Sequence, residues 1–122
     1  MKVLLTLALS LMFLSTTAYA VDTSGNYAIW GAGKKSCISY TESAAKGEVD
    51  FFNNYMEGFL TAYNIFTEKT YSISGKMYKD QIVEWLANYC EENPMSSFET
   101  ALTSFTFDHY DKRMKSSSSM GR

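Results

Sequence analysis

The chain contains one proline, one histidine and two cysteines among its 122 residues. These numbers are too small for a zinc cluster or a haem-binding peptide, which need several such side chains. Basic residues are also few, because 11 Lys and Arg stand against 13 Asp and Glu. That balance argues against a basic nucleic-acid-binding domain, and the length excludes two domains of ordinary size.

Hydrophobic side chains, by contrast, are plentiful. They make up 46% of the chain, and aromatic residues alone make up 16%. A chain with so much apolar side chain is neither a disordered tail nor a low-complexity polymer. We therefore expect one small globular domain that is rich in aromatic residues.

The first 20 residues have the three parts of a secretory signal peptide. Lys2 supplies a positive charge, residues 3–14 are almost wholly apolar, and residues 18–20 read Ala-Tyr-Ala, which fits the small-x-small cleavage site. The alternative is an uncleaved anchor, but the apolar run is much shorter than the roughly 20 residues that span a bilayer. The residue directly after the cleavage site is valine rather than cysteine, so lipid attachment there is excluded. We expect cleavage before Val21, export of the mature chain and no membrane span after cleavage.

The mature chain would carry 10 basic and 13 acidic side chains, a net charge of −3. We divide it into an extended lead-in (21–34), a helical domain (35–115) whose last residues, 108–115, are polar, and a flexible tail (116–122). Three aromatic or apolar side chains of the lead-in are expected to fold back onto the core: Tyr27, Ile29 and Trp30.

Cys37 and Cys90 are the only cysteines, and export would place them in an oxidising compartment. We expect one intramolecular disulfide; two free thiols or an intermolecular bridge are the alternatives. A bridge across a loop of this length stabilises a fold by about 4 kcal/mol in the chain-entropy model. No C-x-x-C spacing indicates redox catalysis, and no histidine lies nearby in the sequence to form a Cys–His nucleophile.

Apolar residues recur at three- and four-residue spacings, which predicts an all-α fold, a small four-helix bundle. The helices are expected over residues 36–46, 48–67 and 77–92, and from residue 96 or 97 onward. The predicted inner faces of the last three helices are Val49, Phe52, Met56, Phe59, Leu60 and Tyr63; Ile82, Val83, Leu86, Tyr89 and Cys90; and Phe98, Ala101, Leu102 and Phe105.

Three local signals define the ends and contacts of these helices. Ser96 and Glu99 have the S-x-x-E spacing of a capping box. Asn93-Pro94 ends the third helix, because the residue before a proline is disfavoured in helical geometry. Gly58 lies in the middle of the second helix, where it costs about 1 kcal/mol relative to alanine. We explain it by a small face, with Ala62 one turn later, that lets another helix approach closely.

No constellation of catalytic residues is recognisable, so we expect a protein that is not an enzyme and that uses no metal or cofactor. His109 stands in a charged stretch and is interpreted as a surface residue. The glycines of residues 31–36 fail the phosphate-loop spacing G-x-x-x-x-G-K-[ST]. Glu91 and Glu92 are interpreted as exposed residues at a helix end. The methionines (56, 77 and 95) have core or cap spacing rather than that of a metal site.

Three segments together are typical of one protein family. They are Ser36-Cys37; residues 55–64, which read YMEGFLTAYN; and residues 85–94, which read WLANYCEENP. Phe98 and Ala101 follow. On these residues the chain resembles the HdeA/HdeB-like family of small periplasmic proteins over about residues 35–102.

The resemblance implies an all-helical fold with one disulfide and fold-defining roles for Gly58, Trp85, Tyr89, Asn93 and Pro94. Founding members of the family are acid-stress chaperones. Immunity proteins against type VI secretion amidase toxins are structurally similar, although many have a second cysteine pair that this chain lacks.

Two functions from different classes follow, with other proteins as the partners in both. The first is a chaperone that binds unfolding clients in acid. The second is an immunity or inhibitor protein that binds one secreted cell-wall hydrolase. A structural or envelope-accessory role is the third reading, and a homodimer stays open.

Overall fold

The computed structural model describes residues 21–119; the predicted signal peptide lies outside them. Within this range the chain forms four α-helices, and β-structure is limited to isolated bridges. The prediction of an all-α four-helix fold is therefore confirmed. The helices are α2 (Cys37–Ala45), α3 (Asp50–Phe66), α4 (Lys79–Glu92) and α5 (Phe98–His109), with short 3-10 helices η1 (Gly31–Lys34), η2 (Tyr110–Lys112) and η3 (Ser117–Ser119).

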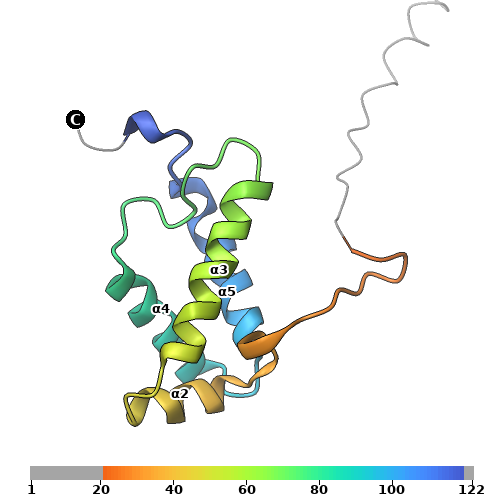
Figure 1. Ribbon diagram of the computed structural model, residues 1–122, viewed down its shortest axis with the longest axis vertical. Coiled ribbons are helices and arrows are strands. Elements are labelled where there is room, and N and C mark those ends of the chain that lie inside the picture. The colour runs from red at the N-terminus through yellow and green to blue at the C-terminus, as the bar shows by residue number, and fades with distance from the viewer. Residues whose placement is uncertain (1–20, 120–122) are drawn as a thin grey trace, which may run out of the picture.

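In Figure 1, α3 lies in front of α5, α4 stands to their left, and α2 crosses the lower end of the molecule. The lead-in enters from the right and continues into η1, which packs against α3 and α5. The 12-residue connection between α3 and α4, residues 67–78, lies at the end opposite α2. None of the helices within residues 21–119 combines the length and apolarity needed to cross a membrane.

The ends of α2 follow directly from its sequence. The Ser36 side chain accepts a hydrogen bond from the backbone N–H of Ser39 at 3.2 Å, which satisfies one of the free donors of the first turn. Gly47, just after the helix, adopts a φ of +70°, a left-handed conformation that favours glycine. The predicted bounds of this helix are thus close to the observed ones.

α5 begins where the sequence predicted, but its cap differs from the prediction. The N-cap is Ser97, whose side chain accepts from the backbone N–H of Thr100 at 3.1 Å. The capping box predicted between Ser96 and Glu99 is wrong. Ser96 lies outside the helix, and its carbonyl oxygen accepts instead from Cys37 N–H at 2.8 Å.

The core is built from the predicted inner faces. Phe98, Ala101, Leu102 and Phe105 of α5 are fully buried. Phe98 stacks on Tyr40 at 4.9 Å between ring centroids, and Phe52 meets both rings edge-on. The other buried side chains of the cluster come from every major element: Ala32, Cys37, Met56, Leu60, Ile73, Ile82, Leu86 and Cys90.

The lead-in departs from the expectation that its large side chains fold onto the core. Trp30 is 76% exposed, with the ammonium group of Lys34 5.8 Å from the centre of its ring. The buried residues are instead Ala32 and Gly33 of η1. A Cβ atom on Gly33 would overlap the Tyr55 hydroxyl, so the chain approaches α3 through glycine backbone rather than through aromatic rings.

Candidate functional site

One end of the bundle, which we call the disulfide end, consists of α2, the last turn of α4 and the first turn of α5. Cys37 and Cys90 are bonded there, with their Cα atoms 4.8 Å apart, and both are buried. The predicted intramolecular disulfide is confirmed. Backbone bonds reinforce it, because Phe98 N–H donates to the Lys35 carbonyl at 2.8 Å and Ser36 and Ser97 pair in an antiparallel bridge.

The opposite end, which we call the loop end, consists of residues 67–78 and the C-terminal segment 110–115. An antiparallel bridge pairs Ser72 with Met114, and Met114 N–H donates to the Ser72 carbonyl at 2.9 Å. Met114 and Ile73 are both buried. The description of residues 108–115 as polar is therefore wrong for Met114, which contributes to the interior.

Arg113 joins the two segments of the loop end through its side chain. Its Nε donates to the Thr70 hydroxyl at 3.0 Å, and its guanidinium lies 3.8 Å from the centre of the Tyr110 ring. The loop end is thus held by hydrogen bonds, a cation–π contact and two buried apolar side chains. It has no covalent cross-link within residues 21–119.

The residues that the resemblance marks on α4 form part of the packing. Trp85 stacks on Tyr89 at 5.5 Å and meets Phe105 edge-on at 5.3 Å. The Asn93 side-chain amide donates to the Tyr89 carbonyl at 2.9 Å, at the end of the helix. Pro94 follows directly, and its carbonyl accepts from Ile38 N–H at 3.2 Å.

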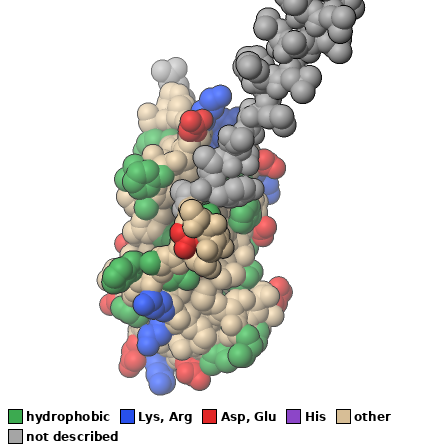
Figure 2. Space-filling view, turned by 90° about the vertical axis from the view of Figure 1, so that its right-hand side faces the viewer, with side chains coloured by type: hydrophobic (Ala, Val, Ile, Leu, Met, Phe, Trp, Pro, Cys, Tyr) green, Lys and Arg blue, Asp and Glu red, His purple; other side chains and the backbone are tan. Residues whose placement is uncertain are grey.

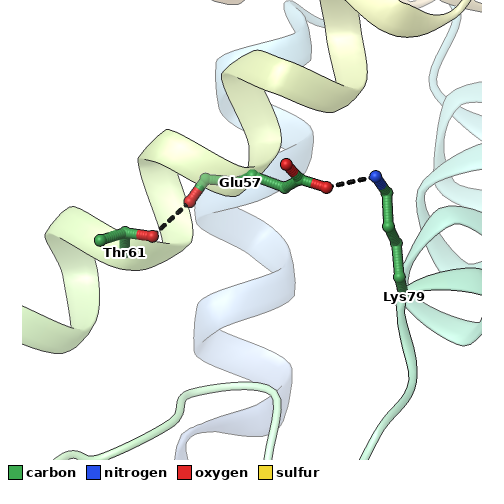
Figure 3. Close-up of polar contacts among 3 residues, drawn as sticks. All are labelled: Glu57, Thr61 and Lys79. Atoms are coloured by element: carbon green, nitrogen blue, oxygen red, sulfur yellow. Dashed lines mark hydrogen bonds and ion pairs between the residues drawn. The ribbon is translucent and has the colours of Figure 1, made fainter.

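Gly58 does not make the helix contact that we predicted for it. A Cβ atom built on Gly58 has no neighbour within 4 Å, and both Gly58 and Ala62 are exposed. No other element of the described chain covers this side of α3. Glu57, the neighbouring residue, instead forms an ion pair with Lys79 of α4, as Figure 3 shows, and its carbonyl accepts from the Thr61 hydroxyl.

Glu99 is buried, although its sequence position indicated a helix cap. One of its carboxylate oxygens accepts from the Thr103 hydroxyl at 2.6 Å and from the Tyr27 hydroxyl at 3.2 Å. Burial raises the pKa of Tyr27 and Tyr55, and the negative charge of Glu99 raises both further. This carboxylate therefore holds the lead-in against α5.

Apolar side chains are also exposed on the surface. The most exposed large ones are Phe66 and Met95, each 85% exposed, together with Tyr78, Phe107, Trp30 and Ile65. Figure 2 shows hydrophobic side chains on its face as separate patches, with acidic and basic side chains between them. Met95 lies at the disulfide end, between α4 and α5, whereas Tyr78 belongs to the loop end.

A shallow groove lies between α2 and α4 at the disulfide end. It has a volume of about 260 Å³ and its walls are mainly apolar. Its lining residues are Ile38, Thr41, Glu42, Cys90, Glu91 and Pro94. The disulfide and the neighbouring backbone hydrogen bonds hold both walls of this groove in place.

Within residues 21–119 no group of three or more His, Cys, Asp or Glu side chains could hold a metal ion. His109 is half-buried rather than a solvated surface residue, and its Nδ1 contacts the Phe105 carbonyl at 2.8 Å. Residues 31–34 form η1, not a phosphate loop, and Glu91 and Glu92 are exposed as predicted. Met56 is buried, Met77 packs beside the core and Met95 is exposed.

The chain matches no family model, no curated protein and no solved structure. The resemblance to the HdeA/HdeB-like family therefore stays a prediction from the quoted residues.

Proposed function

We propose that the protein is an exported, periplasmic protein-binding protein that acts as an acid-stress chaperone for unfolding clients. The observation that carries the proposal is the position of the disulfide relative to the core. The cross-link encloses residues 37–90 and leaves α5 outside the closed loop. A large share of the buried apolar surface thus belongs to a helix that the disulfide does not enclose.

The inner face of α5 is what a loosened chain would expose. Phe98, Leu102 and Phe105 have no solvent exposure in the folded state. Partial detachment of α5 would uncover these side chains and the rings of Phe52 and Tyr40 against which Phe98 packs. The disulfide would keep α2, α3 and α4 together, so the product is compact, with apolar surface available for clients.

Acid supplies the force for this change. All 13 carboxylates lie in the mature chain, so protonating them and charging His109 moves the side-chain total from −3 to +11 (ten Lys and Arg plus one His). Repulsion between the remaining positive charges favours expansion.

The test is client protection in acid. We expect the mature protein, at about pH 2–3, which lies below the ordinary pKa values of carboxylates, to reduce light scattering from an acid-denatured enzyme at near-stoichiometric ratio. A matched acidic helical protein of similar size serves as control, because many small proteins loosen in acid. Unchanged aggregation of the client would contradict the chaperone proposal, even if the protein itself binds an apolar dye.

The groove at the disulfide end favours a second candidate, an immunity or inhibitor protein for one secreted cell-wall hydrolase. A preformed, rigidly framed apolar groove suits one fixed partner better than many unfolding ones. Affinity capture at neutral pH with the parent protein and with Ile38→Asp separates the two functions. Capture of a single hydrolase by the parent, lost in Ile38→Asp, would support the inhibitor; a matched Ile65→Asp variant changes an exposed side chain on α3 and controls for general effects.

A further inference from the structure

The loop end contains a second hollow, distinct from the groove between α2 and α4. It has a volume of about 380 Å³ and is open to solvent. The loop before α4, the first turn of α4, the end of α5 and η2 all contribute to its walls. Its lining residues are Ser74, Gly75, Lys76, Met77, Gln81, His109 and Lys112.

The charged side chains that line this hollow are both lysines. Lys76 and Lys112 line it together with His109, and no carboxylate is among the lining residues. Among the residues that the structure describes, the one ion pair joins Lys79 to Glu57, so neither Lys76 nor Lys112 has a carboxylate partner there. Both ammonium groups can therefore donate hydrogen bonds to a ligand in the hollow.

Two polar side chains that line the hollow, Gln81 and His109, are held by neighbouring groups. The Gln81 carbonyl oxygen accepts from Tyr78 N–H at 2.8 Å, which leaves its NH₂ group as the donor. His109 Nδ1 contacts the Phe105 carbonyl at 2.8 Å, and the ring stacks on Phe105 and meets Trp85 edge-on. Since a carbonyl only accepts, Nδ1 carries a hydrogen and Nε2 is the nitrogen left for a ligand.

The frame around these side chains is compact. Gly75 has a φ of +60°, and a Cβ atom there would lie 2.8 Å from the Lys112 carbonyl oxygen. The bridge between Ser72 and Met114 holds the same two segments together. The loop before α4 and η2 therefore keep Lys76 and Lys112 on two walls of one hollow.

From this arrangement we propose that the hollow at the loop end is a binding site for a phosphate group. A doubly charged anion matches the charge of two ammonium groups, and its oxygens can accept the hydrogen bonds that the lining side chains donate. The histidine favours phosphate over a carboxylate. A hydrogen phosphate can donate its O–H to Nε2 of the neutral ring or accept from the charged ring, whereas a carboxylate can only accept.

The phosphate can come from a free ion or from a lipid headgroup, and two measurements distinguish these sources. The first follows amide shifts of the ¹⁵N-labelled mature protein during titration with inorganic phosphate, with ionic strength held constant by sodium chloride. The second is sedimentation with vesicles that contain phosphatidic acid, whose headgroup is a phosphate monoester, against phosphatidylcholine vesicles, whose phosphate is a diester. We expect saturable shifts at Ser74, Gly75 and Gln81 in the first, and binding to phosphatidic acid alone in the second if a headgroup is the ligand.

A matched pair of variants tests the site itself. Lys76→Gln combined with Lys112→Gln should weaken binding at least fivefold, whereas Lys34→Gln combined with Lys35→Gln removes the same charge elsewhere and should weaken it less than twofold. His109→Gln should reduce the preference for phosphate over acetate. No saturable binding of either phosphate source, or equal weakening by both double variants, would overturn the proposal. Equal urea-unfolding midpoints for the variants ensure that lost binding is not lost folding.

Discussion

The two ends of this molecule are closed by different means. At the disulfide end a covalent bond joins α2 to α4, and backbone hydrogen bonds join residues 35–38 to residues 94–98. At the loop end the chain is held by one antiparallel bridge, the Arg113 side chain and the buried side chains of Ile73 and Met114. Both ends are well packed, but only one is cross-linked.

The difference indicates which part of the fold opens first. A disulfide limits the unfolded chain whatever the solvent, whereas hydrogen bonds and packing are lost as soon as the segments separate. We therefore expect the loop end and α5, which lies outside the closed loop, to open at lower free energy than the cross-linked helices α2 and α4. The proposed chaperone function needs such a separation between a retained part and an opened part.

Removing the disulfide should produce the largest effect. Cys37→Ser combined with Cys90→Ser should lower the free energy of unfolding by about 4 kcal/mol, because the unfolded chain regains the entropy of a closed loop of this length. Urea unfolding of both proteins measures the difference. If the free energy of unfolding fell by less than it does in the Met114→Ala variant described next, the disulfide end would not be the more strongly stabilised of the two ends.

Truncating the buried methionine of the loop end should have a smaller and more local effect. Met114→Ala should lower the free energy of unfolding by about 2 kcal/mol. This value is near the lower limit for such a truncation, because the side chain lies close to the surface. Hydrogen exchange should speed up first at Tyr71 and Ser72, whose N–H groups donate to the Met114 carbonyl. Met95→Ala, at an exposed methionine, is the matched control and should change neither measurement.

Alkaline pH should weaken the disulfide end through Tyr40. Burial raises the pKa of Tyr40 above its ordinary value, so the folded state favours the protonated phenol. The contribution of Tyr40 to the free energy of unfolding is fully present below about pH 10, the ordinary pKa of tyrosine, and is lost as pH rises above that value. The loss is at most about 1.4 kcal/mol for each unit by which the pKa of the folded state exceeds that of the unfolded state. Unfolding at pH 8 and pH 11 should show a smaller alkaline loss in Tyr40→Phe than in the parent. Equal alkaline losses in the two proteins would contradict this role of Tyr40. Some loss of stability at high pH should remain in the variant, because the pKa values of Tyr27 and Tyr55 are also raised.

Gly58→Ala should stabilise the protein by about 0.5–1 kcal/mol, because the position is helical and alanine costs less backbone entropy there. The open space around Gly58 leaves room for the methyl group. Gly33→Ala is the contrasting variant and should destabilise, since its Cβ would overlap Tyr55. Thermal unfolding measures both. A destabilised Gly58→Ala variant would show that another chain covers this side of α3.

The smallest effect should come from the ion pair between α3 and α4. Both side chains of Lys79 and Glu57 are about half exposed (53% and 51%). Water screens such pairs, so Lys79→Gln should change the free energy of unfolding by less than about 0.5 kcal/mol. Thermal midpoints at low and high salt should differ little between variant and parent; a large salt-dependent loss would mean that this pair helps to hold the middle of the bundle.

The sequence predicted the helices and their inner faces well because both depend on local spacing. The three- and four-residue recurrence of apolar residues specifies one face of a helix before any tertiary contact forms. The disulfide was also predictable, since two cysteines allow only one intramolecular pairing. These features need no knowledge of which distant segments meet.

The incorrect predictions all involve distant contacts. Ser96 and Ser97 each have a polar residue three positions later, so spacing alone could not choose between them; Ser97 forms the cap, in register with the bridge to Ser36. Glu99 is buried because Tyr27, 72 residues earlier in the chain, hydrogen-bonds to it.

Neither candidate site could be predicted from the sequence, because both depend on contacts between distant segments. The groove between α2 and α4 and the hollow at the loop end are each lined by segments that are far apart in the sequence. His109 looked like a surface residue because its sequence neighbours are charged, whereas Phe105 and Trp85 half-bury its ring. The binding role that we propose for His109 depends on Lys76 and Lys112, which line the same hollow.

The place of the disulfide also orders events while the chain is being made. In the export that we propose, the N-terminus crosses the membrane first, so Cys90 reaches the oxidising side before α5 (Phe98–His109) does. The closed loop between Cys37 and Cys90 can therefore form before α5 has emerged. It would then display an unfilled site for Phe98, Leu102 and Phe105, which α5 enters last. During that interval the site that we propose for unfolding clients would be open, and α5 would be the first apolar segment to bind there.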